Sequence, residues 1–334
     1  MFVLGDEEKD KEVFALRPMT CPFQYQAYLN RKRSYRDLPL RYNETSTLFR
    51  NEASGEMHGL IRVRQFTISE GHLMCTPEQL EDEFRKCLEL AIFMLKTLGL
   101  YEDVPTASRN GTRMTVQSIS VTEEQWNEAQ GLMERILNHL EIPYEIGIGE
   151  AAFYGPKLDI QIKNVYGKED TLITIQIDQM LAEQFGMVYT DKDGKQKTPC
   201  IIHRTSIGCY ERTLALLIEK YAGAFPLWLA PVQVKLLPIA DRHLDYLYEV
   251  KKQLEDKGFR CEVDDRSEKI GYKIREAQLE KVPYMVVVGD KDIENNTISI
   301  RKRKEGDLGA MTVELLRRAR APHDRHGFGH QERE

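Results

Sequence analysis

The sequence lacks the features that mark membrane-spanning, secreted and uniformly basic proteins. Its 334 residues contain no apolar run near the ~18 residues that a membrane-spanning helix needs. Its start, MFVLGDEEKDKE, turns acidic at once and has no small-residue cleavage site, so we expect no secretory signal peptide. The formal net charge of −6 argues against a protein that is basic throughout, although nucleic-acid-binding proteins often confine their basic residues to one patch.

Cysteine is scarce and scattered. The six cysteines show no disulfide-like spacing, so the sequence predicts no disulfide framework. Cysteines that form no disulfides are most simply explained if the protein resides in a reducing compartment. We therefore expect a cytoplasmic protein with no membrane segment.

Composition and patterning predict a globular protein of two domains. Hydrophobic residues make up 41% and charged residues 30%, which is ordinary for a globular chain. The pattern changes at residues 225–231, beyond which predicted strands alternate with predicted helices, and this favours a mixed or mostly parallel sheet with helices on its faces. The predicted strands there are 232–239, 259–264, 284–288 and 297–302, and the predicted helices are 243–257 and 270–280.

The most informative stretch is residues 48–72, LFRNEASGEMHGLIRVRQFTISEGH. Two predicted strands, 45–51 and 61–69, flank a loop of small and polar residues, which is typical of a hairpin with a long loop. Alternation along the second strand would place Arg62, Arg64 and Phe66 on one face. Two guanidinium groups and an aromatic ring suit a triphosphate and a base plane. The alternative from spacing alone is a charged hairpin on the surface.

Several motifs in a fixed order resemble one enzyme family. FRNE, a loop and RVRQF are together similar to motif 2 of the class II aminoacyl-tRNA synthetases, and HRTSIGCYERTLALLIEKYAG is similar to their motif 3. With RPMTCP, SYRDLPLRYNETST and EAAFYGPK, the series resembles the threonyl-tRNA synthetases over about residues 1–104 and 122–313. The segment 105–121 does not match that pattern.

The resemblance implies an α/β (α+β) fold in two parts. An antiparallel-sheet catalytic domain over residues 1–225 would carry motifs 2 and 3, and a smaller anticodon-binding domain with a mixed sheet would follow over 226–313. We interpret residues 314–334 as a disordered tail, and their histidines leave a metal-binding tail as the alternative. Because family members carry motif 1 and often an editing domain upstream, we expect a chain that is truncated relative to them.

The resemblance also implies a zinc site that recognises threonine. Cys21, His72 and His203 match the family's zinc ligands, although a lone cysteine near a helix start more often packs in a core. Three protein ligands leave a position open on zinc, where threonine would bind through its amine and hydroxyl and valine could not. An apolar pocket alone separates such near-isosteres poorly. Tyr154 and Lys157 would contact threonine, and the alternative for the lysine is a solvated strand start.

By the same resemblance, the chain would activate L-threonine with ATP and magnesium and transfer it to the 3′ end of tRNA(Thr). Arg50, Arg62 and Arg212 are the implied catalytic residues and would contact the phosphates. Glu52 would bind the adenine amino group, and Phe66 would stack on the base. The full ATP- and adenylate-binding set is Arg50, Glu52, Arg62, Phe66, Gln176 and Arg212.

The implied partners are tRNA(Thr), ATP and L-threonine. The family is homodimeric, but we expect its dimer interface, which includes motif 1, to be largely missing from this chain. Arg275, Asp292 and Arg301 lie where the family contacts the anticodon, whose splayed bases would be read as a single strand. The alternative function is a catalytically impaired fragment or paralogue that only binds tRNA or a partner. The Cys/His/His set disfavours prolyl, seryl or glycyl specificity.

Four positions depart from the best-known bacterial pattern of the family. Ile68 and Thr171 stand where glutamine is expected, and Cys209 stands where serine is expected. Glu70 replaces an aspartate two residues before the second zinc ligand. We interpret these departures as those of a divergent branch.

Overall fold

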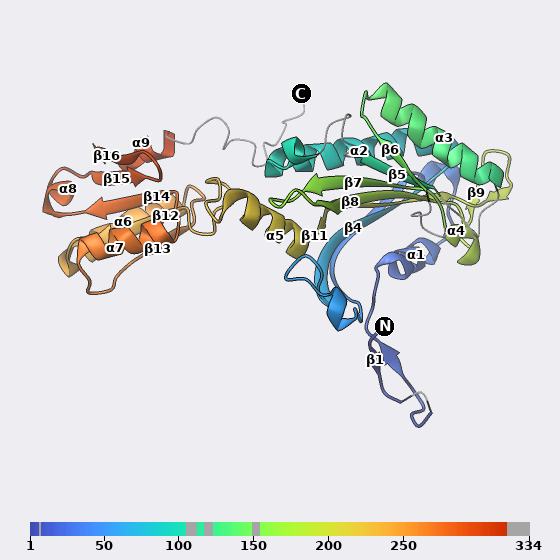
Figure 1. The fold of residues 1–334 in the computed structure, drawn as a ribbon, viewed down its shortest axis with the longest axis horizontal. Coiled ribbons are helices and arrows are strands. Elements are labelled where there is room, and N and C mark those ends of the chain that lie inside the picture. Colours follow the sequence, from blue (N-terminus) through green and yellow to red (C-terminus); the bar gives the residue numbers. More distant parts are fainter. Residues whose placement is uncertain (7, 105–111, 117–122, 149–153, 319–334) are drawn as a thin grey trace. The chain divides into compact units, whose positions relative to one another are not determined.

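The computed structural model describes residues 1–6, 8–104, 112–116, 123–148 and 154–318. Most of the segment 105–121 and residues 319–334 therefore lie outside the described residues. The chain divides into two compact units, Met1–Leu216 and Leu217–Glu334, and each is described by itself (Figure 1).

The first unit is built on a seven-stranded sheet. Its neighbouring strands are antiparallel except for the last two, which are parallel, so the predicted antiparallel sheet is confirmed. In spatial order the strands are β3 (Leu40–Phe49), β4 (Gln65–Cys75), β11 (Cys200–Cys209), β8 (Glu169–Asp178), β7 (Lys157–Lys163), β5 (Thr112–Val116) and β6 (Glu145–Ile148).

Alternation gives the centre of this sheet two different faces. Leu73, Ile202 and Ile177 lie in register on β4, β11 and β8 and are almost fully buried on the face that α2 (Pro77–Leu98) covers (Figure 1). Because successive side chains point to opposite faces, the residues next to them in each strand face away from α2. That opposite face carries the candidate site, and α1 (Cys21–Leu29) lies against it.

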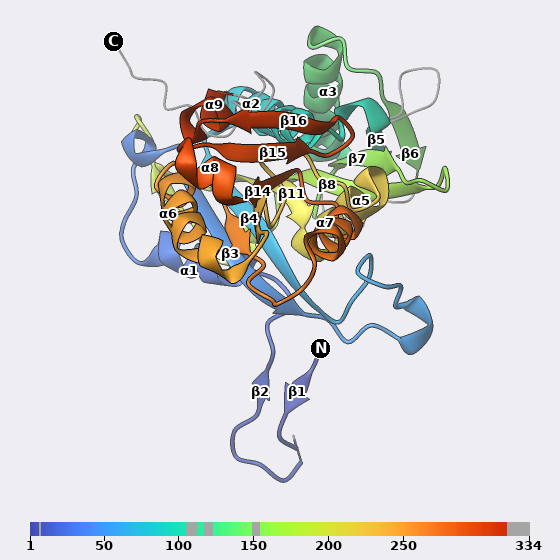
Figure 2. The same ribbon diagram turned by 90° about the vertical axis from the view of Figure 1, so that its left-hand side faces the viewer.

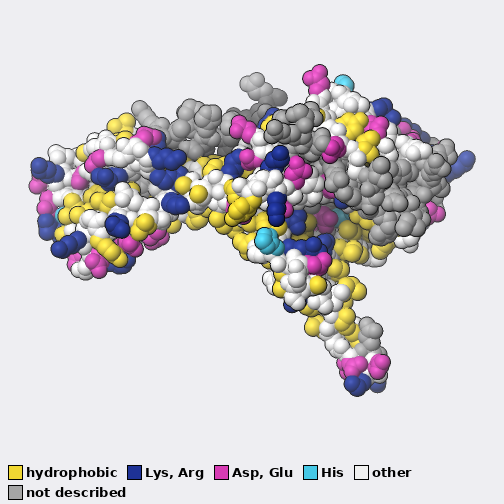
Figure 3. All heavy atoms as spheres, in the orientation of Figure 1, with side chains coloured by type: hydrophobic (Ala, Val, Ile, Leu, Met, Phe, Trp, Pro, Cys, Tyr) yellow, Lys and Arg dark blue, Asp and Glu magenta, His cyan; other side chains and the backbone are white. Residues whose placement is uncertain are grey.

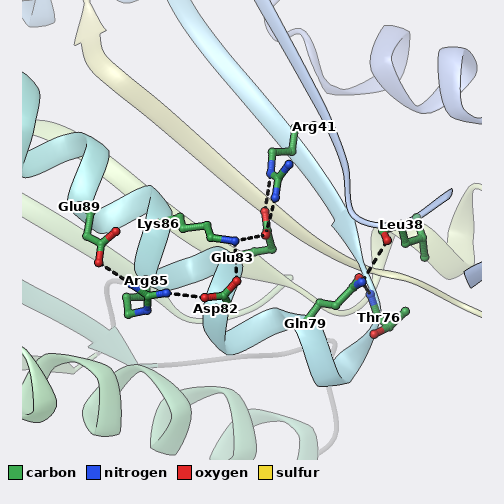
Figure 4. A network of polar contacts seen from close by, with 9 residues as sticks. All are labelled: Leu38, Arg41, Thr76, Gln79, Asp82, Glu83, Arg85, Lys86 and Glu89. Atoms are coloured by element: carbon green, nitrogen blue, oxygen red, sulfur yellow. Dashed lines mark hydrogen bonds and ion pairs between the residues drawn. The ribbon is translucent and has the colours of Figure 1, made fainter. Parts of the chain in front are cut away.

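The helix α2 is fixed by its caps and by a polar network that joins it to β3 (Figure 4). The string Thr76-Pro77-Glu78-Gln79 predicts a capped helix start. In the structure Pro77 is the first residue of α2, and the Gln79 side chain accepts a hydrogen bond from the Thr76 N–H at 3.0 Å. Arg41 on β3 donates two hydrogen bonds of 2.6 Å to the buried Glu83 carboxylate. This bidentate pair ties the edge strand to the helix that covers the sheet.

The hairpin formed by β3 and β4 differs from its prediction. Strand β4 begins at residue 65 rather than 61, so Arg62 and Arg64 precede it and do not share a strand face with Phe66. The loop between the strands bonds to itself instead. Arg62 pairs with the Glu52 carboxylate at 2.8 Å, and Arg64 Nε donates to the Glu52 carbonyl at 3.0 Å.

Smaller elements complete the first unit. Two short hairpins lie outside the main sheet. One precedes it in the sequence, and the other lies between β8 and β11, where the string DKDGK is typical of a hairpin loop. Val3, Leu4 and Phe14 of the N-terminal hairpin expose apolar side chains. These elements are β1 (Val3–Leu4), β2 (Phe14–Ala15), β9 (Tyr189–Thr190), β10 (Gln196–Lys197), α3 (Glu123–His139), α4 (Leu181–Gln184), α5 (Tyr210–Tyr221), which continues into the second unit, and the 3₁₀ turns Tyr35–Asp37, Ser54–Glu56 and Tyr101–Asp103.

The second unit is a five-stranded mixed sheet with helices on both faces. β13, β12 and β14 are parallel, and β15 and β16 add antiparallel strands, which confirms the predicted mixed sheet. Apolar residues of α6 and α9 pack on one face, and those of α7 pack on the other (Figure 2). The bounds are β12 (Val234–Pro238), α6 (Leu244–Glu255), β13 (Cys261–Val263), α7 (Ile270–Leu279), β14 (Tyr284–Val288), α8 (Asp290–Glu294), β15 (Ile298–Lys302), β16 (Gly306–Met311), α9 (Val313–Arg318) and a 3₁₀ turn, Asp241–His243.

The sequence prediction missed β16, α8 and α9, while Tyr284–Val288 was predicted with its observed bounds. The sequence of β16 is GDLGAM, and its two glycines and one aspartate are residue types that are rare in strands, so the sequence does not predict a strand here. It exists because the outer edge of β15 supplies hydrogen-bond partners, which the sequence does not display.

Candidate metal and nucleotide site

Strand register creates a polar row across the face opposite α2. His72 on β4 pairs with His203 on β11, which pairs with Gln176 on β8, which pairs with Lys157 on β7. Paired residues of neighbouring strands project to the same side. The row therefore joins four predicted site residues that are far apart in the sequence.

Cys21 closes a metal-binding cluster over this row. Its Sγ lies 3.0 Å from His72 Nε2 and 3.7 Å from His203 Nδ1, and the two imidazole rings are 4.7 Å apart between centroids. The thiol comes from the first residue of α1, whose proline at the next position suits a helix start. Ligand atoms of Cys21, Glu70, His72 and His203 all lie within 4.8 Å of one another.

Each histidine is oriented by a hydrogen bond from the ring nitrogen that faces away from Cys21. His72 Nδ1 lies 2.8 Å from Gln24 Oε1, and His203 Nε2 lies 2.8 Å from Asp178 Oδ2. Asp178 is itself fixed, because its other oxygen accepts the N–H groups of Met180 and Leu181 at the start of α4. Such outer bonds fix the tautomer and aim the remaining nitrogen at a metal.

The donor set fits zinc. One thiolate and two neutral imidazoles are ligands that Zn²⁺ favours. Burial, and then the charges of His203 and Arg204, lower the pKa of His72 well below its usual value, so its imidazole is neutral at physiological pH. Burial and the nearby Glu70 charge raise the pKa of the Cys21 thiol to about 12. A cation would offset both effects on the thiol and stabilise the thiolate.

Tyr154 and Lys157 lie beside this cluster. The Tyr154 ring stacks on His203 at 5.2 Å, and its hydroxyl donates to Gln176 Oε1 at 2.5 Å. Lys157 pairs with the buried Asp159 at 2.6 Å. Gly155 lets the backbone approach β8 rather than a ligand, because a Cβ there would lie 2.0 Å from the Ile177 carbonyl oxygen.

The nucleotide-binding candidates lie next to the metal cluster. The Arg50 guanidinium covers the Phe66 ring at 5.2 Å from its centroid. Arg212 donates to the carbonyl oxygens of Thr171 at 2.7 Å and of Ile61 at 3.1 Å, so this arginine joins α5 to β8 and to the hairpin loop. No acidic side chain among the described residues pairs with Arg50 or Arg212, which leaves their charges for an anionic ligand.

One cavity of about 640 Å³ joins these groups. Its lining includes all of the first-unit residues predicted for the metal, threonine and ATP except His72, which lies beneath it in the cluster. Ile68, Thr171 and Cys209, where the sequence departs from the family pattern, line the same cavity. Their lining positions indicate that the departures concern ligand contacts rather than the fold.

Three residues of the site were not predicted as such. Glu70 was noted only as a departure, Asp178 only as part of a strand, and Gln24 not at all. Gln24 follows Cys21 by three positions and so shares its face of α1, which was the available signal. Nothing local in the sequence pairs Asp178 with His203.

The anticodon candidates belong to the second unit. Asp292 is buried and accepts bonds from the Gly289 N–H at 3.0 Å and the Ser299 hydroxyl at 2.9 Å, which gives it a structural role in fixing α8. Arg301 pairs with Asp307 at 3.1 Å and lines a small groove, and Arg275 is exposed on α7. On the face drawn in Figure 3, Lys and Arg side chains alternate with Asp and Glu.

Among the described residues, none of the helices has the length and apolar composition to cross a membrane.

The fold and site define a class II aminoacyl-tRNA synthetase core followed by an anticodon-binding unit. The family described as tRNA synthetase class II core domain (G, H, P, S and T) matches residues 2–221, and the anticodon binding domain family matches residues 233–318. A threonyl-tRNA synthetase structure from Cryptosporidium parvum, described as its RNA binding domain, superposes with a TM-score of 0.85 at 32% identity, over 95% of this chain and 78% of that one. The chain belongs to the threonyl-tRNA synthetase family.

Curated relatives agree with this assignment. A threonine–tRNA ligase from Clostridium perfringens is 61% identical over 94% of the chain, and one from Clostridium botulinum is 62% identical over 95%. Each match covers 49% of the relative, so the chain spans about half the length of the curated relatives it matches.

Proposed function

We propose that the chain provides the synthetic site and the anticodon-binding part of a threonine–tRNA ligase. It would join L-threonine to ATP as threonyl-adenylate and transfer threonine to the 3′ end of tRNA(Thr). The observation that carries this proposal is that the metal cluster containing Cys21, His72 and His203 adjoins the cavity that Arg50 and Arg212 line. The names of the Clostridium relatives support the same reaction.

In this proposal, zinc held by Cys21, His72 and His203 supplies a Lewis-acidic position for the amine and hydroxyl of threonine, which valine cannot fill. The protein groups around it orient the amino acid. Tyr154 stands over His203 and would close the pocket against water, while Lys157 would face the threonine carboxylate. A site that must engage the hydroxyl discriminates far better than an apolar pocket.

The reaction would proceed by positioning and charge stabilisation, with no covalent protein intermediate. Arg50 would hold the α-phosphate above Phe66, whose ring would stack on adenine. Arg212, which has no carboxylate partner among the described residues, would hold the phosphates from the other side with magnesium. Arg62 now pairs with Glu52 and would exchange that partner for the γ-phosphate, leaving Glu52 for the adenine amino group.

The remaining assignments form part of the same proposal. Residues 1–225 would be the catalytic domain and 226–313 the anticodon-binding domain. The predicted tail 314–334 is wrong at its start, because residues 314–318 belong to α9 and Leu316 is buried in the core of the second unit. Arg275, Asp292 and Arg301 would contact the anticodon, Asp292 in addition to its bonds to Gly289 and Ser299. Arg301 lies at the lip of a groove that Lys302 and Lys304 also line. The protein would act in the cytoplasm.

Threonine-dependent exchange between ATP and pyrophosphate tests the proposal. We expect the purified chain, supplied with zinc and magnesium, to exchange label with threonine and not with valine. Cys21→Ser should abolish exchange, while Cys200→Ser serves as the matched control because Cys200 lies on β11 outside the cavity. A folded, zinc-loaded chain without exchange would instead favour the alternative of a module that only binds tRNA or a partner.

A further inference from the structure

Glu70 stands inside the metal cluster although it was not expected there. It precedes His72 by two positions on β4, so both side chains project to the same face of the sheet. Its carboxylate lies within 4.8 Å of the ligand atoms of Cys21, His72 and His203. It also lines the cavity, as Cys21 and His203 do.

The Glu70 carboxylate is held in this place by one bond. Thr20, which is fully buried and directly precedes Cys21, donates its hydroxyl to Glu70 Oε2 at 2.6 Å. Within the described part of the chain, Thr20 is the only hydrogen-bond partner of that carboxylate, so its second oxygen remains for another ligand. The same two-residue segment thus anchors the carboxylate and supplies the thiolate.

Charge and reach both favour coordination by this residue. Zn²⁺ with one thiolate and two neutral imidazoles has a net charge of +1, and a carboxylate bound to the metal would bring the net charge of the metal and its direct ligands to zero. Asp178, the other buried carboxylate nearby, bonds to His203 instead. Uncompensated buried charge is costly, and zinc without substrate favours four tetrahedral ligands. Glutamate extends one methylene further than the aspartate of the usual family pattern, which suits a ligand rather than a more distant partner.

We propose that Glu70 is a fourth zinc ligand that closes the site until threonine displaces it. The inference rests on the proposed function, since it takes threonine to be the displacing molecule. A displaced Glu70 would then accept hydrogen bonds from the threonine amine or hydroxyl. An amino acid that cannot chelate would leave the carboxylate in place, so the closed site would add to discrimination against valine.

Zinc affinity tests the coordination directly. Competition with a chromophoric chelator would compare the full chain with Glu70→Gln, which keeps the shape and the Thr20 bond but loses the charge. We expect zinc affinity to fall about 10–100-fold, as for loss of a group that supports a metal site. Glu44→Gln is the matched control. Glu44 on β3 lies directly opposite Glu70 on β4, but its carboxylate forms an ion pair with Arg17 and does not belong to the metal cluster. Zinc affinity in this control should change less than about twofold.

Cobalt substitution tests the displacement. The visible spectrum of the Co²⁺-loaded chain should be unchanged by azide, a small probe that needs an open position, and should change with threonine but not with valine. In Glu70→Gln, azide should change the spectrum. Glu70→Asp, which keeps the charge but is shorter, should behave like Glu70→Gln and provides the test if the glutamine variant does not fold.

Two results would overturn the inference. One is equal zinc affinity in Glu70→Gln and the unmodified chain, with threonine affinity reduced, which would make Glu70 a substrate contact only. The other is an azide response in the unmodified chain as strong as in the variant. If zinc affinity falls as expected but threonine never alters the cobalt spectrum, Glu70 remains a ligand while threonine recognition, and with it the proposed function, fails.

Discussion

The bond between Asp178 and His203 gives the sharpest test of the metal site. His203 Nε2 lies 2.8 Å from Asp178 Oδ2, and both side chains are almost fully buried, with 4% and 0% exposed. Asp178 Oδ1 accepts the N–H groups of Met180 and Leu181. The substitution Asp178→Asn preserves the shape and those two acceptor bonds, and it changes only the group that faces the imidazole.

The effect of Asp178→Asn follows from which atoms at this position can donate a hydrogen bond and which can accept one. The two backbone N–H groups hold the amide oxygen, so the amide NH₂ must face His203 Nε2. Two donors cannot face each other, and the imidazole will move its proton to Nδ1, the nitrogen 3.7 Å from Cys21 Sγ. That nitrogen then presents a hydrogen where a metal needs a lone pair. We expect zinc affinity to fall about 10–100-fold, equivalent to roughly 1.4–2.7 kcal/mol.

Chelator competition measures that loss, and ATP–pyrophosphate exchange at limiting and saturating zinc shows whether added zinc restores activity. Asp191→Asn is the matched control, because Asp191 pairs with Lys197 on the surface hairpin away from the cavity. Melting curves would verify that both variants fold. Unchanged zinc affinity in a folded Asp178→Asn chain would refute the assignment of His203 as a ligand through Nδ1.

Three further predictions concern separate parts of the first unit. Glu83→Gln should lower the unfolding free energy in urea by about 1–3 kcal/mol, because the Arg41 bridge is charge-assisted. Burial acts to raise the pKa of Glu83, but bonds from Arg41 and Lys86 lower it overall. The stabilisation is therefore complete above the unfolded-state pKa near 4.5 and is lost as pH falls through the lower folded-state pKa, a dependence that the glutamine variant should lack. Arg212→Lys should reduce exchange about 10²-fold or more without unfolding the chain, since lysine cannot hold two carbonyls and a phosphate together. Gly208→Ala should destabilise by more than about 2 kcal/mol in the same urea assay, because φ is +71° and the new Cβ would lie 2.1 Å from a β8 carbonyl oxygen. Unchanged urea midpoints or exchange rates would contradict these three predictions.

The sequence by itself determined the local elements and the family. Apolar residues at helical spacing and the Thr76–Gln79 cap predicted α2, and alternating strands and helices predicted the mixed sheet of the second unit. These features depend on interactions between residues near in the chain, which leave periodic and capping signals. The motifs that identify the family are likewise contiguous strings.

Only the tertiary structure decided how the site is assembled. The pairing of His72 with His203 depends on the register of β4 against β11, two strands that are distant in the sequence and have no local signal for their pairing. The register of β8 against β11 brings Asp178 to the back of His203, and the register of β4 against β11 brings Glu70 into the metal cluster. The hairpin loop is a second feature that the tertiary structure decided. Arg62 and Arg64 were predicted in a strand, but they lie in the loop, where both bond to Glu52. Such bonds form between charged side chains that the fold brings close together, so they cannot be predicted from the alternation of residues along a strand.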